Sequence, residues 1–303
     1  MKPRLPVKPK DSSNIQSVDA TPGQLSANDK KTQSVEPSVK ATSFKKQPAN
    51  AQPQKQDKER KRILISGCNS LVGHSLFQQM RNDDVMIKSG GKPHEFLGTL
   101  VQRDASVVPV PADCIHILNM QTKPKTFTKG VLTSDIIVID LLSGADPTES
   151  ETIIKILRQP LQENGGKSQT LVVISSVMAW VNTKRGSNEF LDTDYSLRVP
   201  TPKYQFIKNI ENLALTANKV NPNLKVHVVC SGLPYGNGEA NDVFYEFFRR
   251  AWLSSHPELA ALPVIGQGNN SLPTIHVTDL AMCVRLLTQG KEPISKQYLI
   301  AVD

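Results

Sequence analysis

Short apolar runs recur along the chain from residue 63 to its end, and segments with helical spacing separate several of them. The first run, Ile63-Leu64-Ile65-Ser66, ends at Gly67 and is followed by a helical pattern from Leu71 to Met80. Further runs occupy Phe96–Val101, Ile115–Met120, Asp135–Leu142, Thr170–Ser176, Val226–Ser231 and Tyr298–Val302. Buried strands that alternate with helices predict an α/β fold with a parallel, doubly wound sheet.

One predicted helix begins with a clear start signal. Asp146-Pro147-Thr148-Glu149 offers an N-cap acid, a proline at the first helical position and a glutamate for a capping box. The apolar residues that follow on one side are Ile153, Ile154, Ile156, Leu157 and Leu161. We expect this helix to cover one face of the sheet.

A second helix carries an apolar stripe at positions i, i+4 and i+8. The stripe consists of Val243, Phe244, Phe247, Phe248, Ala251 and Trp252. A stripe of this width is typical of a helix that buries one side, so we expect it to pack into the core of the domain. A face that binds a partner is the alternative.

Charge divides the chain near residue 60. Residues 1–62 hold 14 Lys or Arg and 6 Asp or Glu, out of 36 and 28 in the whole chain, which leaves 22 of each for the remainder. The formal charge of +8 therefore lies in the N-terminal part, where Phe44 is the single aromatic residue. We expect residues 1–60 to be a basic, low-complexity tail, disordered when alone, and residues 61–303 to form one folded domain.

Several classes of protein are disfavoured. No apolar run reaches the roughly 18 residues of a membrane span, and the early prolines Pro3, Pro6 and Pro9 interrupt any targeting helix. The four cysteines lie far apart, without a C-x-x-C pair, and the six histidines are dispersed. The basic tail lacks interleaved aromatic residues. We expect a soluble intracellular protein without a metal site, without membrane attachment and without bound nucleic acid.

Two motifs suggest chemistry. Gly67-Cys68-Asn69-Ser70-Leu71-Val72-Gly73 lies where a strand gives way to a helix, as in phosphate-binding turns, but Ser70 stands where a third glycine is usual. Tyr204 and Lys208 are spaced to share one side of a helix, where the ammonium can lower the pKa of the phenol. About 30 residues upstream, an apolar run ends in Ser175-Ser176, whose hydroxyls can polarise a carbonyl.

The order of these motifs resembles the extended short-chain dehydrogenases and NAD-dependent epimerases over essentially all of residues 63–303. Tyr235-Gly236, Gly266-Gln267-Gly268 and His276-Val277-Thr278-Asp279-Leu280-Ala281 complete the order. The resemblance implies a Rossmann-type sheet, a dinucleotide at Gly67, Ser70 and Gly73, and catalysis by Ser176, Tyr204 and Lys208.

A narrower resemblance is to the N-terminal domain of the adenylate kinase 7 family. It is carried by Ser175–Trp180, Ser231–Gly236, Ala251–Leu253, Leu262–Gly268, Pro273–Ala281 and Tyr298–Asp303. The resemblance implies a protein of cilia and flagella. No G-x-x-x-x-G-K-[ST] loop occurs in the chain, which ends at Asp303, so we expect no adenylate kinase activity.

Departures from the dehydrogenase pattern argue against easy catalysis. Leu141 and Leu142 stand where epimerases end a strand in two small residues beside the cofactor, and the added bulk disfavours a dinucleotide by about 1–3 kcal/mol or more. Arg103 holds the place of the acid expected after the second strand, with Asp104 following, so NADP suits a bound cofactor better than NAD. Residues 269–274 lack the arginine with which epimerases hold nucleotide sugars.

These features favour a structural or docking component of the ciliary axoneme, in a radial spoke or an associated complex, built on a degenerate NAD(P)-binding domain. The expected cofactor is none or NADP. The expected partners are axonemal proteins, with tubulin as a candidate for the tail, whose charge comes in patches. An NADP-dependent oxidoreductase or epimerase is the alternative.

Overall fold

The computed structural model describes residues 60–81, 93–101, 115–143, 146–159, 166–184, 189–238, 243–253, 255–256, 261–262, 264, 266–289 and 294–303. The predicted tail up to residue 59, together with Arg103, Asp104 and Leu161, lies outside these residues. The predicted boundary between tail and domain therefore stays a prediction.

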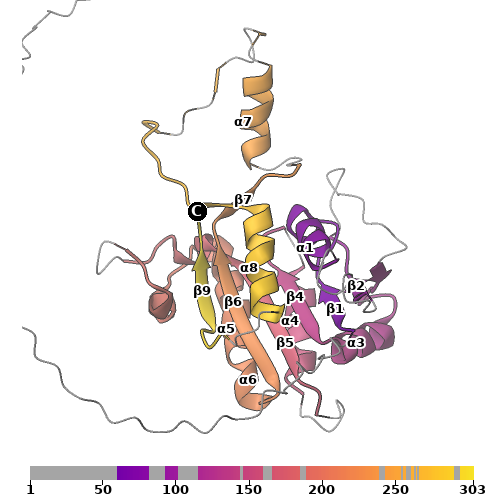
Figure 1. Ribbon diagram of the computed structural model, residues 1–303. Coiled ribbons are helices and arrows are strands. Elements are labelled where there is room, and N and C mark those ends of the chain that lie inside the picture. The colour runs from indigo at the N-terminus through magenta and orange to yellow at the C-terminus, as the bar shows by residue number, and fades with distance from the viewer. Residues whose placement is uncertain are drawn as a thin grey trace, which may run out of the picture. The chain divides into compact units, whose positions relative to one another are not determined.

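Seven parallel strands form the central sheet (Figure 1). They are β1 (Arg62–Ile65), β2 (Glu95–Gly98), β3 (Ile115–Ile117), β4 (Ile136–Asp140), β5 (Gln169–Ser176), β6 (Leu224–Ser231) and β9 (Tyr298–Ala301). Their order in space is β3-β2-β1-β4-β5-β6-β9, in which the first six strands follow the arrangement of the doubly wound dinucleotide-binding fold. Each of the seven apolar runs overlaps one of these strands, so the predicted fold class is confirmed. β1 lies inside the sheet, between β2 and β4.

The sheet is buried on both faces because alternate side chains of each strand point to opposite sides. In β1, Leu64 belongs to the core cluster on one face of the sheet, called the first cluster here. Ile63 and Ile65 belong to the cluster on the other face, called the second cluster. β4 repeats the alternation, with Ile137 in the first cluster and Val138 in the second. Continuous apolar runs, rather than alternating ones, are the sequence pattern that this burial requires.

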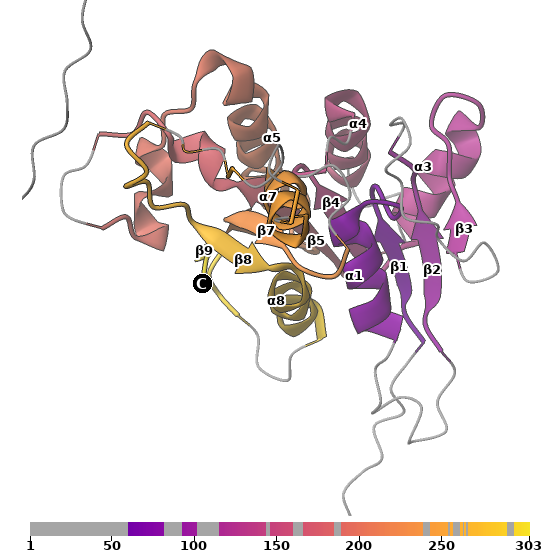
Figure 2. The same cartoon turned by 90° about the horizontal axis from the view of Figure 1, so that it is seen from above.

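Helices cover both faces, as the view from above shows (Figure 2). They are α1 (Leu71–Arg81), α3 (Pro124–Thr133), α4 (Pro147–Leu157), α5 (Gln205–Leu215), α6 (Ala217–Val220), α7 (Val243–Trp252) and α8 (Val277–Gln289). Side chains of α3, α4, α5 and α6 complete the first core cluster, and those of α1 and α8 complete the second. The prediction that α4 covers one face of the sheet is confirmed.

A second, two-stranded sheet was not predicted from the sequence. It pairs β7 (Leu233–Tyr235) with β8 (Thr274–His276) in parallel. Gly232 lies so close to the return segment that a Cβ atom there would come within 2.9 Å of the Pro273 carbonyl oxygen. This pairing fixes both ends of the long excursion that contains α7.

The predicted packing of α7 into the core is wrong. Within α7, no residue whose side chain is described is buried, and Phe248 and Trp252 are 53% and 88% exposed. The single ring contact of α7 with another element in the described part of the chain joins Phe244 to Tyr235 of β7, with centroids 6.0 Å apart. Both faces of the sheet are already covered by the other helices, which explains why the stripe has no core to enter.

Candidate functional site

The candidate site lies at the carboxyl ends of β1, β2 and β4, where the strand order reverses beside β1. Crevices at such reversals are where open α/β sheets bind ligands. The chain leaves β1 through Gly67, whose φ of +66° is a left-handed conformation that favours glycine. Gly73 of α1 packs directly on this turn, because a Cβ atom at Gly73 would lie 2.2 Å from the Gly67 carbonyl oxygen.

Four backbone N–H groups of this turn, those of Gly67, Cys68, Ser70 and Gly73, donate to acceptors of the protein itself. Gly67 N donates to Thr99 Oγ1 at 3.1 Å, and Cys68 N donates to the Thr99 carbonyl oxygen at 2.9 Å. Ser70 N donates to the Gly67 carbonyl oxygen at 2.9 Å. Thr99 comes directly after β2, so the segment that follows the second strand closes over the turn.

Asn69 and Val101 strengthen this closure. Asn69 Nδ2 donates to the Val101 carbonyl oxygen at 3.1 Å, and Val101 N donates to Asn69 Oδ1 at 2.8 Å. The Val101 side chain approaches to 2.8 Å of the position that a Cβ atom on Gly67 would take. The turn and the segment after β2 therefore form one packed unit.

Ser70 caps the N-terminus of α1. Its Oγ accepts a hydrogen bond from Gly73 N at 2.9 Å and donates one to Asp140 Oδ2 at 3.1 Å. Gly73 N–H is one of the helix N-terminal groups that can serve a bound phosphate in related folds. Here a side-chain oxygen holds that position, and an acidic side chain stands behind it at the positive end of the helix dipole.

Asp140 is fully buried at the end of β4. Burial raises the pKa of its carboxyl, while hydrogen bonds from Ser143, Leu142 N and Ser70 act in the opposite direction. Leu142 N donates to Asp140 Oδ1 at 2.9 Å. These bonds to both carboxyl oxygens hold the end of β4 against the N-terminus of α1.

A pocket of about 240 Å³ opens beside the turn. It is lined by Ser66, Gly67, Thr99, Leu100, Val101, Ile117, Leu118, Asn119, Met120, Gln121, Asp146 and Glu149. Neither Leu141 nor Leu142 contributes to this lining; Leu141 is buried in the first core cluster, and Leu142 packs on the second. The predicted obstruction by these two leucines therefore does not act on this pocket.

Glu149 lines this pocket, although the sequence predicted that it would form a capping box at the start of α4. Asp146 caps α4 as predicted, with its side chain accepting from Thr148 N at 2.8 Å. The predicted capping box is wrong, because Glu149 Oε1 instead accepts from Thr99 Oγ1 at 2.6 Å and from Ser66 Oγ at 3.2 Å. Burial raises the pKa of Glu149, and these two hydrogen bonds partly offset the rise. The carboxyl thus joins α4 to the end of β1 and to the segment after β2.

The three predicted catalytic residues belong to two elements: Ser176 to β5, and Tyr204 and Lys208 to the start of α5. Ser176 ends this strand, and its Oγ accepts from Met178 N at 3.2 Å as the cap of a short 3-10 helix, η1 (Val177–Trp180). Tyr204 directly precedes α5 and packs partly buried against the first core cluster. Lys208 Nζ donates to the Arg198 carbonyl oxygen at 2.7 Å. Although all three are described, no hydrogen bond joins any two of them, so their catalytic roles stay a prediction.

A buried ion pair supports this end of the sheet. The Arg198 guanidinium donates to the Glu211 carboxylate of α5, and their side chains are 2% and 0% exposed. Glu211 also accepts from Ser175 Oγ, and from the Tyr298 hydroxyl at 3.3 Å. Because Lys208 bonds to the carbonyl of Arg198, the ion pair also fixes the position of the lysine.

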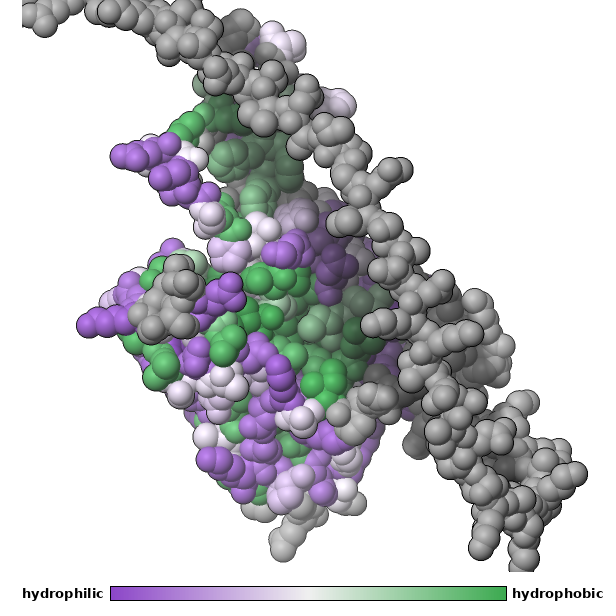
Figure 3. Space-filling view, turned by 60° about the vertical axis from the view of Figure 1, so that its left-hand side comes forward, coloured by the Kyte–Doolittle hydropathy of each residue, from purple (hydrophilic) through white to green (hydrophobic). Residues whose placement is uncertain are grey.

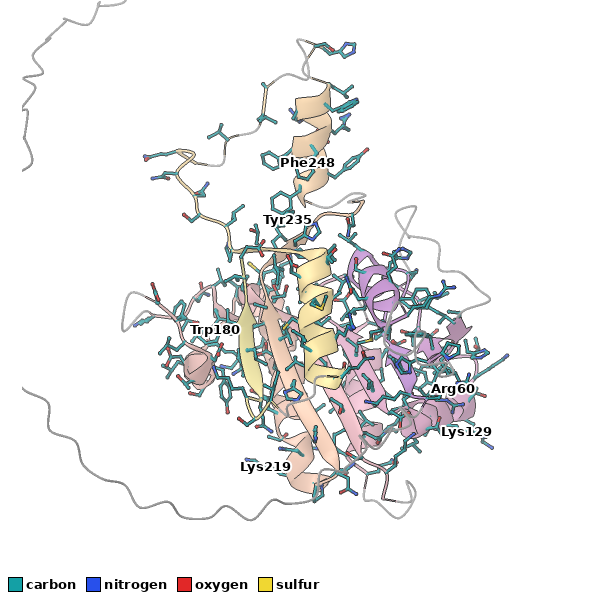
Figure 4. All side chains as sticks on the ribbon, in the orientation of Figure 1. Arg60, Lys129, Trp180, Lys219, Tyr235 and Phe248 are labelled. Carbon is teal, nitrogen blue, oxygen red and sulfur yellow. The ribbon has the colours of Figure 1, made fainter. Side chains whose placement is uncertain are left out.

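Aromatic rings enclose the ion pair. Tyr195, from η2 (Asp192–Leu197), stacks on Tyr298 with centroids 5.1 Å apart, and Arg198 lies 5.4 Å from the centre of the Tyr298 ring. Trp180 Nε1 donates to the Tyr298 hydroxyl at 3.0 Å. Figure 4 labels Trp180 beside β9, on the outer edge of the sheet. The network thus joins η1, α5 and β9, which lie far apart in the sequence.

Asp140 and Glu211 were not predicted as site residues, although each leaves a signal in the sequence. Asp140 interrupts an otherwise apolar run, and a charge in a buried strand requires a partner. Glu211 follows Ile210 on the apolar side of α5, where a carboxylate also needs a partner. The sequence gives no comparable signal that Arg198 is this partner, because Arg198 comes from an irregular segment.

Other classes of site lack support in the part of the chain that the structure describes. The described residues contain no group of three or more side chains suited to a metal ion, and no described helix is long and apolar enough to cross a membrane. Burial raises the pKa of Cys68 to about 11 and of Cys230 to about 12, so neither thiol is a nucleophile near neutral pH.

The chain shares its fold with a dehydratase and an epimerase of known structure. dTDP-glucose 4,6-dehydratase from Bacillus anthracis, solved in complex with NAD, matches with a TM-score of 0.58 and 14% identity over 80% of this chain and 75% of that chain. UDP-N-acetylglucosamine 4-epimerase from Bacillus cereus matches with a TM-score of 0.52 and 16% identity over 77% and 74%. At these identities the likeness shows the fold alone.

In sequence, the chain is similar to adenylate kinase 7 of Mus musculus, with 34% identity over 142 residues. The match covers 45% of this chain and 22% of that protein, so the chain spans about a fifth of its length. No family model matches the chain. The predicted resemblances to adenylate kinase 7 and to the epimerase fold are both confirmed.

Breaking the buried pair of Arg198 and Glu211 should lower the stability of the fold strongly, and removing both charges should restore most of that stability. Arg198→Met leaves Glu211 buried without its cation, so the free energy of unfolding should fall by about 3–5 kcal/mol. Replacing both partners, as Arg198→Met with Glu211→Leu, should recover most of this loss. Urea denaturation measures both. As a control, Lys296→Met breaks an exposed pair with Asp192 and should cost less than about 1 kcal/mol. A cost for Arg198→Met no larger than the control would contradict the role of the pair.

Glu149 predicts a dependence of stability on pH. Because its pKa is raised above the ordinary 4.5, protonation favours the folded state, and this contribution is lost as pH rises through the raised pKa. Gln cannot ionise, so Glu149→Gln should become increasingly stable relative to wild type as pH rises above about 4.5. Urea midpoints measure the trend. Glu151→Gln, on the exposed side of α4, is the matched control, and an identical trend in both variants would refute the assignment.

Proposed function

We propose that this domain is a docking module of the ciliary axoneme, in a radial spoke or an associated complex, and that it does not turn over a dinucleotide. The absence of turnover is proposed because the protein itself makes hydrogen bonds to the turn after β1. Thr99 bonds to Gly67 N and Cys68 N, and Ser70 bonds to Gly73 N. A pyrophosphate bound there in the usual way would have to displace these bonds and approach Asp140.

The similarity to adenylate kinase 7 supports the first part. The sequence resemblance to this family implies a place in cilia, and the basic tail supplies a means of attachment. The tail carries its cations in patches separated by neutral spacers, which suits an extended chain that follows a large acidic surface. Tubulin-rich filaments present such a surface. The domain would then serve as a folded anchor for other axonemal proteins.

One observation favours the alternative of an NADP-dependent oxidoreductase or epimerase. Ser176 ends β5, and Ser175 beside it bonds to Glu211 of α5, the helix that contains Lys208 and directly follows Tyr204. The amine of Lys208 is bonded to a backbone carbonyl, and the hydroxyl of Ser176 caps η1. Catalysis would require these groups to exchange their present partners for a substrate and for one another.

Titration calorimetry with NADP and with NAD tests the cofactor site. We expect wild-type protein to bind neither more tightly than about 1 mM. Ser70→Gly combined with Asp140→Asn removes the hydroxyl cap and the acid behind it, so it should bind more tightly than wild type. Asp192→Asn, which removes an acid remote from the turn, is the control. Micromolar binding by wild type, or carbonyl reduction with NADP that is lost in Tyr204→Phe, would favour the oxidoreductase.

Extraction of detergent-stripped axonemes with salt tests whether the protein is bound to the axoneme. We expect the protein to stay with axonemes near 0.1 M salt and to leave them near 1 M, because the Debye length falls from about 10 Å to about 3 Å. Deletion of residues 1–60 should reduce retention at the lower salt concentration. Equal retention of the truncated chain would assign docking to the folded domain alone, and absence from axonemes would remove the proposal.

A further inference from the structure

Cations without an acidic partner gather on α3 and at the residue before it. Residues 119–134 hold Lys123, Lys125 and Lys129 and contain neither aspartate nor glutamate. All three lysines are exposed, and none of them forms an ion pair in the part of the chain that the structure describes. The surface of α3 is therefore positively charged.

The placement of these cations opposes what a helix prefers. The first turn of α3 contains Lys125 and no acidic residue, although the helix dipole favours negative charge there. Lys129 follows four residues later, so the two ammonium groups share one side of the helix and repel each other. Departures from local preference of this kind are expected at functional sites. Both lysines are thus candidates for contact with an anionic partner.

Lys125 and Lys129 line a hollow of about 480 Å³ on the surface of α3. The other lining residues are Pro124, Thr128, Leu132 and Thr133. Apolar and hydroxyl groups thus surround the two ammonium groups, and no carboxylate belongs to the described lining. A bound anion would meet cations in this hollow and no like charge.

The end of this hollow at Thr133 is electrically balanced. Arg62 donates to Thr133 Oγ1 at 2.6 Å and pairs with Glu95 at 2.8 Å. Lys167 donates to the Thr133 carbonyl oxygen at 2.9 Å and pairs with Asp135 at 2.7 Å. The excess charge of the hollow is therefore carried by its two lysines alone.

The spacing of these lysines matches that of an extended peptide. Positions four apart on a helix are separated by about 6 Å along its axis. Alternate residues of an extended chain point to the same side and are separated by about 6.6 Å. Glutamates at alternate positions of an extended segment can therefore pair with Lys125 and Lys129 at the same time.

We propose that α3 binds an extended acidic segment of a partner protein, with two of its carboxylates paired to Lys125 and Lys129. The charge of this segment is complementary to that of the hollow. The docking function proposed above underlies this assignment, which adds the chemistry of the partner. Arg60, the first described residue, lies 3.9 Å from Glu95, so the basic N-terminal part of the chain enters the domain near the same surface. A partner that attracts those basic residues can continue onto α3.

Other anionic partners fit the hollow less well. A membrane surface is reached by apolar side chains that project, as those of α7 do (Figure 3), whereas Pro124 and Leu132 line a hollow. Single-stranded nucleic acid is held by aromatic rings on which its bases stack, and the described lining contains no aromatic residue.

Fluorescence anisotropy with two labelled peptides and the full chain tests the spacing. Ser-Glu-Ser-Glu-Ser-Glu-Ser has its glutamates on one side when extended. Its isomer Glu-Ser-Ser-Glu-Ser-Ser-Glu has neighbouring glutamates on opposite sides. We expect wild type to bind the alternating peptide about threefold more tightly near 0.1 M salt, because the isomer loses one ion pair. The basic residues before Arg60 attract both peptides alike, since the two peptides have equal charge.

The double variant Lys125→Gln, Lys129→Gln should bind the alternating peptide about fivefold more weakly and should lose the preference, because both ion pairs are removed. The matched control is Lys219→Gln, Lys225→Gln, which removes two exposed lysines from α6 and β6. Figure 4 labels Lys219 well apart from Lys129. This control should keep the preference and change both affinities less than about twofold.

Carbodiimide cross-linking locates the bound peptide. The reagent activates a glutamate carboxylate of the peptide, which then forms an amide with a nearby lysine amine. Mass spectrometry of the wild-type product should find the alternating peptide on Lys125 and Lys129 in higher yield than on Lys219 or Lys225.

Three outcomes would overturn the proposal. They are equal binding of the two peptides by wild type, equal effects of the two double variants, and cross-links spread evenly over the exposed lysines. Binding to anionic vesicles or to single-stranded DNA that only the α3 double variant loses, without a peptide preference, would assign the hollow to phosphate groups. If the protein is retained on axonemes while the peptide tests fail, the α3 surface alone is refuted.

Discussion

The hydrogen bonds of Thr99 and Ser70 to the turn at Gly67–Gly73 hold together the segments at the carboxyl ends of β1, β2 and β4. They bring the segment after β2 onto the turn, and through Ser70 they connect α1 to Asp140 at the end of β4. Glu149 extends the same system to α4 by accepting from Thr99. A polar network that satisfies buried groups is rigid, so the three connections around β1 behave as one unit.

A second network stabilises the other half of the sheet. The Arg198–Glu211 pair holds an irregular segment against α5, and Tyr298 connects the pair to the last strand. Both networks place carboxylates where apolar packing would otherwise suffice. Such groups stabilise little on balance, but they favour one arrangement, because any other leaves a charge buried without a partner. The arrangement of the sheet is thereby fixed at two separate places.

The sequence predicted the sheet well and its polar contacts poorly, for a physical reason. Buried strands such as Ile136–Asp140 need a continuous apolar run whichever neighbours they acquire, so local pattern identifies them. The partner of a buried polar group depends on tertiary structure. Glu149 fits a capping box by spacing, yet it bonds to Thr99 and Ser66 instead. The spacing of the α7 stripe likewise identifies an apolar side, but it does not state which surface that side contacts.

The closure of the turn by Ser70 and Thr99 also bears on how the fold responds to its surroundings. A dinucleotide-binding domain ordinarily gains stability from its cofactor in proportion to the logarithm of cofactor concentration. A domain that binds no dinucleotide, as proposed above, has no such dependence. In the docking role proposed above, its folding would remain constant while the ratio of reduced to oxidised dinucleotide changes with metabolic state.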